Sequence, residues 1–548
     1  MRAPKTAKPE PVGLWDRAIL PFLHRHSLVI ATLFVAIGAA RIVAAYSAVF
    51  FTNDEFGHFA SGLEYVANHA YRYDLEHPPL ARVLAATLPY LAGARPAGQP
   101  DRSFEAQTVL VRSGDPDHMV ALARAGVLPL FVLACAVVFF WCRHSFGNAT
   151  AAAATALFTL VPPVLAHAGL VTTDMALTAD LGAAFLALVL WAESPTWKRT
   201  WLLAFALAFA ALAKFTALLY LPAATLFALA AYLALEWPGF EGLLALARER
   251  APGLAAATAL GSLLIWAGYG FSYGYVSGWD LHLPAPEFFN GILTVVGHNN
   301  EGHAAYLLGE YSPTGWWYYF PVVLAVKTPL GFLLLAGVGV WVCWRNRTKV
   351  RYWLPAAFSA GVLLPAMYGN INIGVRHILP AYLSFSILAA MGLLRLAKWL
   401  PALGAALFVW IAVSGALAHP DYIPYFNELA PAAREKVLVD SDLDWGQDFE
   451  RLARRLRELG VTQIHMGSML HADPDFLKWT GLPSIEPINP VVRAEGWTVV
   501  SPTLDKTTQY GLMHKFANVL PWYAKLPPTE RVGALLLYYV PPGTGQKP

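Results

Sequence analysis

The chain has 548 residues, of which 57% are hydrophobic and 14% are charged, and its formal net charge is +3. Its mean hydropathy of +0.46 is too high for a soluble globular protein, and several segments approach or exceed the roughly 18 apolar residues of a membrane span. No basic run is interleaved with aromatic residues as nucleic-acid binding requires, so no nucleic-acid partner is expected. The three cysteines lie inside or at the ends of apolar runs, which argues against a disulfide framework and a cysteine metal site.

The N-terminus is basic but lacks the short apolar core and cleavage site of a signal peptide, so we expect residues 1–27 to form a retained cytoplasmic tail. Apolar runs over residues 28–419 predict a mainly α fold, a polytopic membrane helix bundle of about eleven spans. The fifth and sixth spans could also be drawn as one long broken helix. The expected spans are Leu28–Phe51, Val120–Trp141, Ala151–Leu170, Met175–Trp191, Trp201–Ala213, Phe215–Leu235, Leu254–Phe271, Tyr319–Cys343, Trp353–Tyr368, Ile378–Leu394 and Ala402–Ala418.

The positions of the basic residues predict the orientation of the bundle. With the tail in the cytoplasm, the inside loops carry clusters of Arg and Lys, whereas the outside connections after the first loop carry almost none. An odd number of spans then places the first loop, residues 52–118, and everything after residue 419 on the extracytoplasmic face. The sequence therefore predicts an integral, multi-pass protein with a cytoplasmic N-terminus and an extracytoplasmic C-terminus.

The first outer loop contains the densest polar cluster of the chain, TNDEFGHFASGLEYVANHAYRYDLEHPPLAR, residues 52–82. Its apolar residues recur at helical spacing, which predicts an interfacial helix that ends at His77-Pro78-Pro79. A second short interfacial helix is expected over Leu80–Leu88. The apolar stripe of the first helix consists of Phe56, Phe59, Leu63, Val66 and Ala70.

After residue 419 the hydropathy falls, which predicts a small extracytoplasmic α/β domain over residues 420–548 with a parallel core. The acidic run Asp440–Asp448 fails as a calcium loop, because Trp445 stands where that loop needs glycine. We expect Asp444 to cap the following helix instead. The predicted elements are a strand at Lys436–Val439, a helix at Gln447–Leu459 and a strand at Val461–Met466.

Several short motifs follow one another in a familiar order on the outer face. Together they resemble the GT-C superfamily of polyprenyl-phosphate-sugar-dependent glycosyltransferases, in the branch of the protein O-mannosyltransferases and aminoarabinose–lipid A transferases. The resemblance implies a GT-C type bundle in a bacterial inner membrane. It also implies transfer of a sugar from a polyprenyl-phosphate donor to a hydroxyl of a protein or glycolipid, with inversion. The motifs are Asn53-Asp54-Glu55, Glu76-His77-Pro78-Pro79-Leu80, Thr172-Thr173-Asp174, Lys214 and Gly374-Val375-Arg376-His377.

The resemblance assigns the catalytic role to carboxylates of the outer connections, Asp54 with its neighbour Glu55, and Asp174. Asp54 lies just beyond the first span, where a carboxylate held close to a hydroxyl is a reasonable general base. Helix N-capping is the alternative for Asp54 and for Asp174, because Asp is favoured at that position.

Four basic residues are candidates to bind the donor phosphate. Arg376 offers a planar, bidentate donor group, and His377 can add a further hydrogen bond. Lys327 lies inside the eighth span, where a charge usually faces the interior of the bundle. Lys214 lies in the turn between the fifth and sixth spans. The alternative for Arg376 and Lys214 is that they extend to lipid headgroups.

Glu76, His77 and His58 are expected to line the substrate pocket, and Glu76 aligns with a metal-holding glutamate of the lipid A branch. Glu76 and His303 are therefore candidate ligands of a divalent metal, which is the one cofactor that the sequence leaves open. A transporter or flippase of lipid-linked sugars is the alternative function, and a non-catalytic scaffold is a third. Transport would need polar groups at the bilayer midplane, whereas here the acids and histidines gather in the outer loops.

Overall fold

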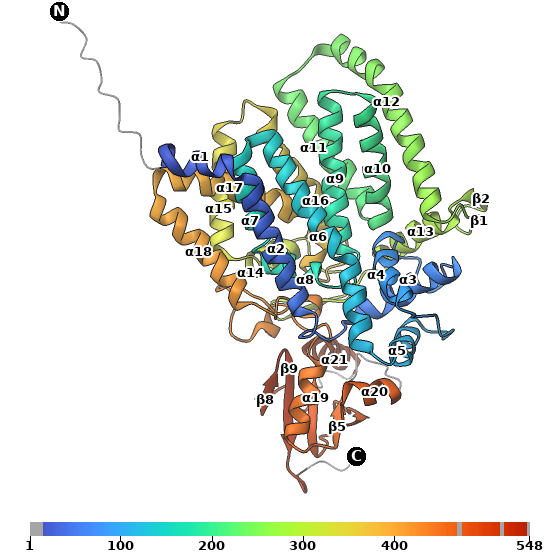
Figure 1. Ribbon diagram of the computed structural model, residues 1–548. Coiled ribbons are helices and arrows are strands. Elements are labelled where there is room, and N and C mark those ends of the chain that lie inside the picture. Colours follow the sequence, from blue (N-terminus) through green and yellow to red (C-terminus); the bar gives the residue numbers. More distant parts are fainter. Residues whose placement is uncertain (1–14, 468–473, 516–519, 545–548) are drawn as a thin grey trace, which may run out of the picture.

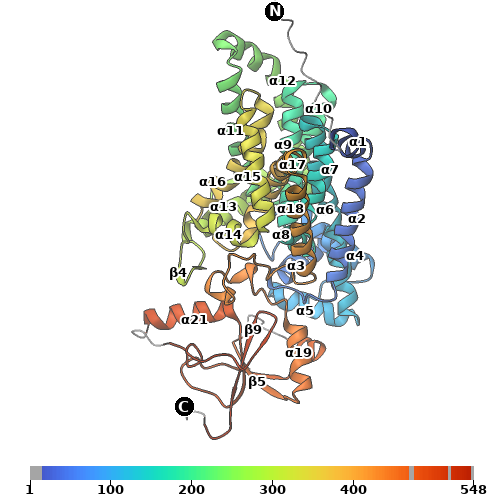
Figure 2. The ribbon, with the colours of Figure 1, turned by 90° about the vertical axis from the view of Figure 1, so that its left-hand side faces the viewer.

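The computed structural model describes residues 15–467, 474–515 and 520–544. A helix bundle makes up most of the chain, and the C-terminal domain lies at one end of it, hereafter the site end (Figures 1 and 2). The bundle helices are α2 (Ser27–Ala45), α6 (Pro116–Phe146), α7 (Asn148–Phe158), α8 (Pro162–Ala168), α9 (Asp174–Glu193), α10 (Trp197–Ala213), α11 (Ala217–Leu235), α12 (Gly239–Gly268), α14 (Tyr319–Lys327), α15 (Leu330–Arg345), α16 (Leu354–Tyr368), α17 (Ala381–Trp399) and α18 (Pro401–Leu417).

The mainly helical membrane architecture is confirmed, and each expected span corresponds to one helix or to one bent pair of helices. By length and hydropathy, six of the described helices can cross a membrane, or up to eight if each bent pair is one span. The pairs α7–α8 and α14–α15 are bent by 70° and 116°. The other three expected spans, α10, α16 and α18, have 17, 15 and 17 residues, which is below the usual length of a span.

The fifth and sixth expected spans are two helices, α10 and α11, separated by a short turn that contains Lys214. At one end of α9, Trp191 Nε1 donates a hydrogen bond to Thr200 Oγ1 at 3.0 Å. At the other end, Lys214 Nζ donates a hydrogen bond to Oδ1 of Asp174, the first residue of α9. Helices α9 and α10 are therefore antiparallel, and the turn places Lys214 at the site end.

The first loop folds into three helices, α3 (Asn53–Asn68), α4 (Leu80–Leu91) and α5 (Arg102–Arg112). Helix α3 ends at Asn68, earlier than expected, because His69 adopts a left-handed conformation with φ 51°. Gly62 allows α3 and α4 to pack closely, since a Cβ atom there would lie 2.2 Å from the carbonyl oxygen of Arg82. Helix α3 thus packs against α4 and α5, and α4 packs against α6.

The expected tail is partly helical. Residues 1–14 of it lie outside the described residues, and the π-helix η1 (Trp15–Ile19) and helix α1 (Leu20–Arg25) follow. Helix α1 lies away from the C-terminal domain, toward the opposite end of the bundle (Figure 1). The long connection after α12 contains two short hairpins with a helix between them. The elements are β1 (Tyr273–Val276), β2 (Leu281–Pro284), α13 (Pro286–Glu301), β3 (Ala305–Leu307) and β4 (Glu310–Ser312).

The C-terminal domain has a mixed sheet of five strands in the order β6-β5-β7-β9-β8. Strand β5 pairs in parallel with β6 and β7, as expected for the core, whereas β9 pairs antiparallel with β7 and β8. The bounds are α19 (Phe449–Glu458), β5 (Gln463–Met466), α20 (Pro474–Thr480), β6 (Ser484–Pro487), β7 (Gly496–Val500), α21 (Pro502–Lys515), β8 (Glu530–Val532) and β9 (Leu535–Val540).

The expected strand at Lys436–Val439 is wrong. Arg434–Lys436 forms a 3-10 turn, and the following valines and leucine are buried without joining the sheet. Asp444 is not the residue that precedes a helix either, because α19 begins only at Phe449. The segment between α18 and α19 packs against the bundle at the site end instead.

Candidate active site

A cavity of about 660 Å³ lies at the site end of the bundle, within the range typical of small-molecule sites. Its wall comes from connections far apart in sequence: the start of α3, the α10–α11 turn, α13, the α16–α17 connection and the segment after α18. The charged and histidine side chains of the wall are Asp54, His58, Asp74, Glu76, His77, Arg102, Lys214, His298, His303, Arg376, His377 and Asp440.

Asp54 and Arg376 form an ion pair in this cavity, with 2.6 Å between Asp54 Oδ2 and Arg376 Nη1. Asp54 is not the helix cap, because Thr52 occupies that position with Glu55 as its capping-box partner. The Arg376 guanidinium lies 4.3 Å from the ring centroid of Trp445, a stacking contact that favours a cation. Burial alone would lower the pKa of Arg376, but nearby carboxylates, first that of Asp54, raise it.

Arg376 retains donor capacity beside this pair. Its Nε atom is buried and has no hydrogen-bond partner within the described residues. His377 follows on the same short 3-10 turn and also lines the cavity. Burial, and after it the positive charges of Lys214 and Arg376, lowers the pKa of His377 well below its usual value. The turn therefore presents a charged guanidinium beside a neutral imidazole.

Asp174 and Lys214 form a second ion pair, with 2.6 Å between Oδ1 and Nζ. Lys214 lines the cavity, whereas Asp174 lies behind it. Asp174 is the first residue of α9 and Thr173 is the cap, so the capping alternative for Asp174 is wrong. Asp174 Oδ2 has no hydrogen-bond partner in the described part of the chain. The pair fixes the ammonium group of Lys214 at the cavity wall.

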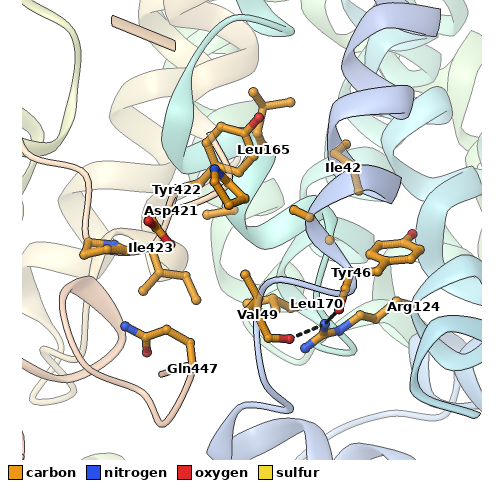
Figure 3. A pocket seen from close by; sticks show the side chains of 15 residues that line it. Ile42, Tyr46, Val49, Arg124, Leu165, Leu170, Asp421, Tyr422, Ile423 and Gln447 are labelled. Atoms are coloured by element: carbon orange, nitrogen blue, oxygen red, sulfur yellow. Dashed lines mark hydrogen bonds between the residues drawn. The ribbon is translucent and has the colours of Figure 1, made fainter. Parts of the chain in front are cut away.

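Glu55 points away from the cavity into the protein. Its carboxylate pairs with Arg124 of α6 at 2.8 Å and accepts the backbone N–H of Val171 at 2.8 Å. Arg124 also donates to the carbonyl oxygens of Tyr46 and Val49, beside a second, small cavity (Figure 3). Glu55 thus joins α3 to α6 and to the connection before α9, and Arg124 extends this link to the residues at the end of α2.

Lys327 is buried but does not line the cavity. Its Nζ atom donates hydrogen bonds to the carbonyl oxygens of Ile423 and Asp442, at 2.7 and 2.6 Å. Both acceptors belong to the segment after α18. The lysine that the sequence suggested for phosphate therefore holds this segment against the bundle.

His58, Asp74 and His77 offer ligand atoms within 4.8 Å of one another, but their surroundings do not suit a cation. Arg82 and Arg102 both form ion pairs with Asp74, and Arg82 Nε donates to His58 Nδ1 at 3.2 Å. Burial alone would raise the pKa of Asp74, but Arg82 and His77 hold it well below its usual value. Two guanidinium groups already supply the positive charge that a metal would bring.

The predicted metal ligands Glu76 and His303 lie on either side of His298. Glu76 Oε2 is 3.6 Å from His298 Nδ1, and His298 Nε2 is 3.2 Å from His303 Nδ1. Burial, as the first cause, lowers the pKa of His303. These three residues offer oxygen and nitrogen donors, which suit a divalent ion. They do not form a compact three-ligand cluster, however, because among the described residues only the His58 group brings its ligand atoms within 4.8 Å of one another.

Sequence reasoning missed two cavity residues that follow the bundle, Asp440 and Trp445. Both lie in the acidic run Asp440–Asp448, whose spacing fails as a calcium loop and for which the sequence predicts a helix cap. The signal that could have found them is Trp445 itself, a large aromatic residue within a run of four aspartates. A solvated linker has no need of such a residue. Arg102, also in the wall, had no motif to mark it.

One side of the cavity is apolar and continues to the outer surface of the bundle. Leu218 and Leu219 of α11, Val296 of α13 and Tyr368 of α16 line it, and each of them is exposed. Helix α11 is an apolar helix of 19 residues with few buried side chains. The cavity thus opens at its side where the bundle would face lipid.

Residues 120–248 match the model of the dolichyl-phosphate-mannose-protein mannosyltransferase family. The crystal structure of ArnT from Cupriavidus metallidurans in the apo state is similar over 92% of this chain and 97% of that chain, with 14% identity and a TM-score of 0.49. The same protein bound to undecaprenyl phosphate gives 15% identity and a TM-score of 0.48, with the same coverage. The Archaeoglobus fulgidus oligosaccharyltransferase in the apo form gives 14% identity and 0.42, over 85% of this chain and 62% of that one.

No curated protein sequence matches this chain significantly. The family match and the ordered motifs define a multi-pass membrane protein similar to the glycosyltransferases of the GT-C superfamily. Within that superfamily, the similarity is to the polyprenyl-phosphate-dependent branch that contains the protein mannosyltransferases.

Proposed function

We propose that the chain transfers a sugar from a polyprenyl-phosphate donor to a hydroxyl group of a protein or glycolipid, with inversion. The observation that carries this proposal is the Asp54–Arg376 pair, a carboxylate and a phosphate-binding group side by side in one cavity. The apolar opening at Leu218 and Tyr368 supports a donor that carries a lipid chain. The match to a dolichyl-phosphate-mannose-dependent family supports the same class of donor.

In the proposed reaction, the acceptor oxygen attacks the anomeric carbon as the bond from that carbon to the phosphate oxygen breaks. Asp54 takes the proton of the acceptor hydroxyl. Its Oδ1 atom is suited to this role, because Arg376 contacts only Oδ2 and Oδ1 has no partner among the described residues. The electron pair of the broken bond leaves with the polyprenyl phosphate. Arg376 and Lys214 neutralise the charge of that leaving group, and His377 adds a hydrogen bond.

We place the reaction on the extracytoplasmic face of a bacterial inner membrane, because the basic residues gather at the opposite end of the bundle. A divalent ion, if bound, would meet Glu76 and His303 in the cavity wall and would supply further positive charge for a phosphate. The base and the guanidinium come from residues of this chain.

The test is transfer in proteoliposomes that contain a radiolabelled polyprenyl-phosphate sugar and either a peptide or a glycolipid acceptor. We expect Asp54→Asn to lower the rate by about 100-fold or more, the scale of general base catalysis. Asp117→Asn, an exposed carboxylate at the start of α6, is the matched control and should keep full activity. Movement of the labelled lipid between leaflets without transfer would instead support the transporter.

A further inference from the structure

The C-terminal segment Asp440–Trp445 forms part of the cavity wall, and it is fixed to both sides of the Asp54–Arg376 pair. The backbone N–H of Val375 donates to Asp442 Oδ1 at 3.1 Å. On the other side, the N–H of Asn53 donates to the carbonyl oxygen of Trp445 at 3.0 Å. The position of this segment is therefore set by Val375 and Asn53, which are adjacent in sequence to Arg376 and Asp54.

Gly374 permits this close approach. A Cβ atom on Gly374 would lie 2.5 Å from Ser441 Oγ, and its φ of +113° is one that other residues rarely adopt. The motif glycine before Arg376 is thus required by the C-terminal segment. This ties the sequence around Arg376 to the residues that follow the bundle.

Asp440 has an unusual backbone, with φ 60° in the left-handed region, which Asp and Asn tolerate better than most residues. Its N–H donates to Thr503 Oγ1 at 2.8 Å, and its carbonyl oxygen accepts the N–H groups of Leu443 and Asp444 at 2.9 Å each. These bonds hold the turn, and the side chain of Asp440 lines the cavity. Such conformations persist where the surroundings fix them, and they cluster at ligand sites.

Four carboxylates line the cavity, and three of them have a cationic or histidine partner: Asp54, Asp74 and Glu76. Asp440 has none within salt-bridge distance in the described part of the chain. Burial, as the first cause, raises its pKa, and the positive charge of Arg376 opposes that shift. One oxygen of the Asp440 carboxylate accepts the backbone N–H of Ser441. The other oxygen is partly desolvated and requires a hydrogen-bond donor, which a neutral hydroxyl group supplies.

We propose that Asp440 accepts hydrogen bonds from hydroxyl groups of the sugar on the donor lipid, and so contributes to recognition of that sugar. This inference rests on the proposed function. Asp440 and Arg376 line the same cavity, and the negative charge of Asp440 helps to raise the pKa of Arg376. A phosphate bound at Arg376 would carry the sugar on one of its own oxygen atoms. The ligand class is a glycosyl group with free hydroxyls, and the residue acts on specificity rather than on the proton.

The experiment compares binding of bare undecaprenyl phosphate with binding of undecaprenyl phosphate that carries mannose, glucose, galactose or aminoarabinose. Wild type should bind at least one sugar-bearing lipid more tightly than the bare lipid. In Asp440→Asn, which keeps a residue suited to the left-handed backbone, that sugar-bearing lipid should bind about 10-fold more weakly. Affinity for the bare lipid should stay within about 2-fold.

Asp421→Asn is the matched control, since Asp421 also lies between α18 and α19 but pairs with Arg451 outside this cavity. It should bind like wild type. If Asp440→Asn loses affinity for both lipids equally, or for neither, the sugar role is overturned. If wild type prefers none of the four sugar-bearing lipids, it is overturned as well. If wild type binds no lipid phosphate at all, the proposed donor class fails, and the inference fails with it.

Discussion

Arg376 pairs with Asp54 across 322 positions of sequence, and the two side chains meet at 2.6 Å in one cavity. In the proposed reaction, a phosphate would bind beside this pair, because Arg376 Nε is buried and has no hydrogen-bond partner within the described residues. Asp54 Oδ1 would stay open to the acceptor hydroxyl. The pair would then hold the proposed base next to the group that binds the leaving phosphate.

We expect Arg376→Lys to weaken binding of undecaprenyl phosphate by about 10-fold or more, because Lys lacks the planar, bidentate donor group. It also loses the stacking contact with Trp445. Isothermal titration or native mass spectrometry measures the affinity. Arg451→Lys is the control, since Arg451 contacts Asp421 in the C-terminal part. Unchanged affinity in Arg376→Lys would contradict the phosphate role.

Glu55 and Arg124 are both almost fully buried, so removing one leaves the other charge without its partner. We expect Arg124→Met to lower the free energy of unfolding by about 3–5 kcal/mol. The double variant Arg124→Met with Glu55→Gln should recover part of that loss. Thermal unfolding in detergent measures both. Asp54→Asn should change the free energy of unfolding far less. If Arg124→Met and Asp54→Asn lose equal stability, the structural role of the Glu55–Arg124 pair is contradicted.

The contrast between Asp54 and Glu55 shows how far the sequence could reach. Successive helical residues point about 100° apart, so one of two adjacent acids faces the cavity and the other faces α6. The motif order predicted that both acids lie at the site, but nothing local distinguishes the two directions. The partner of Glu55 is 69 positions away, and only the packed bundle reveals it.

Tertiary docking also explains the errors after residue 419. Val437–Val439 has the β-branched pattern of a strand, yet it is buried against the bundle rather than in the sheet. Lys327 was predicted to face the interior, which holds, but its partners are carbonyl oxygens of the docked segment. Helix periodicity and hydropathy predicted the bundle well, because those signals are local.

Lys327→Met removes both hydrogen bonds to the segment after α18, which should loosen it. We expect trypsin to cleave after Arg434 and Lys436, which are exposed, several-fold faster in this variant. Time courses of limited proteolysis on gels measure the rate. Lys349→Met, far from the segment in sequence and at an exposed loop, is the control. Equal cleavage of variant and wild type would mean that Lys327 does not hold the segment.

His58 makes the cavity sensitive to pH. Burial first, then His77 and Arg82, lowers its pKa well below the usual value, and a neutral ring is needed to accept the hydrogen bond from Arg82. In the unfolded chain the pKa is about 6.5, so this contribution to stability is complete above that pH. It is lost as the pH falls from 6.5 toward the lower folded-state pKa.

We therefore expect His58→Asn, whose amide oxygen can still accept, to lose less stability than wild type between pH 7.5 and pH 5.5. The difference should be about 1 kcal/mol for one proton. Thermal unfolding of both proteins at the two pH values measures it. A parallel loss in both proteins would assign the pH dependence to other groups.

Sidedness can be tested with single cysteines in a background where the half-buried Cys343 is replaced by Ser. We expect Thr507→Cys, exposed on α21, to react with an impermeant maleimide added to intact cells with a permeabilised outer membrane. Thr348→Cys, exposed in the loop after α15, should react only after lysis. The reverse pattern would place the cavity in the cytoplasm.

Asp440 and Trp445 come after α18, the last helix of the bundle, yet they complete the wall around Arg376. A nascent chain that has inserted all of its bundle still lacks this part, and gains it only when the downstream residues have been synthesised and docked. Translation fragments that stop after α18 but before residue 440 would then contain every helix of the bundle and still lack part of the cavity wall.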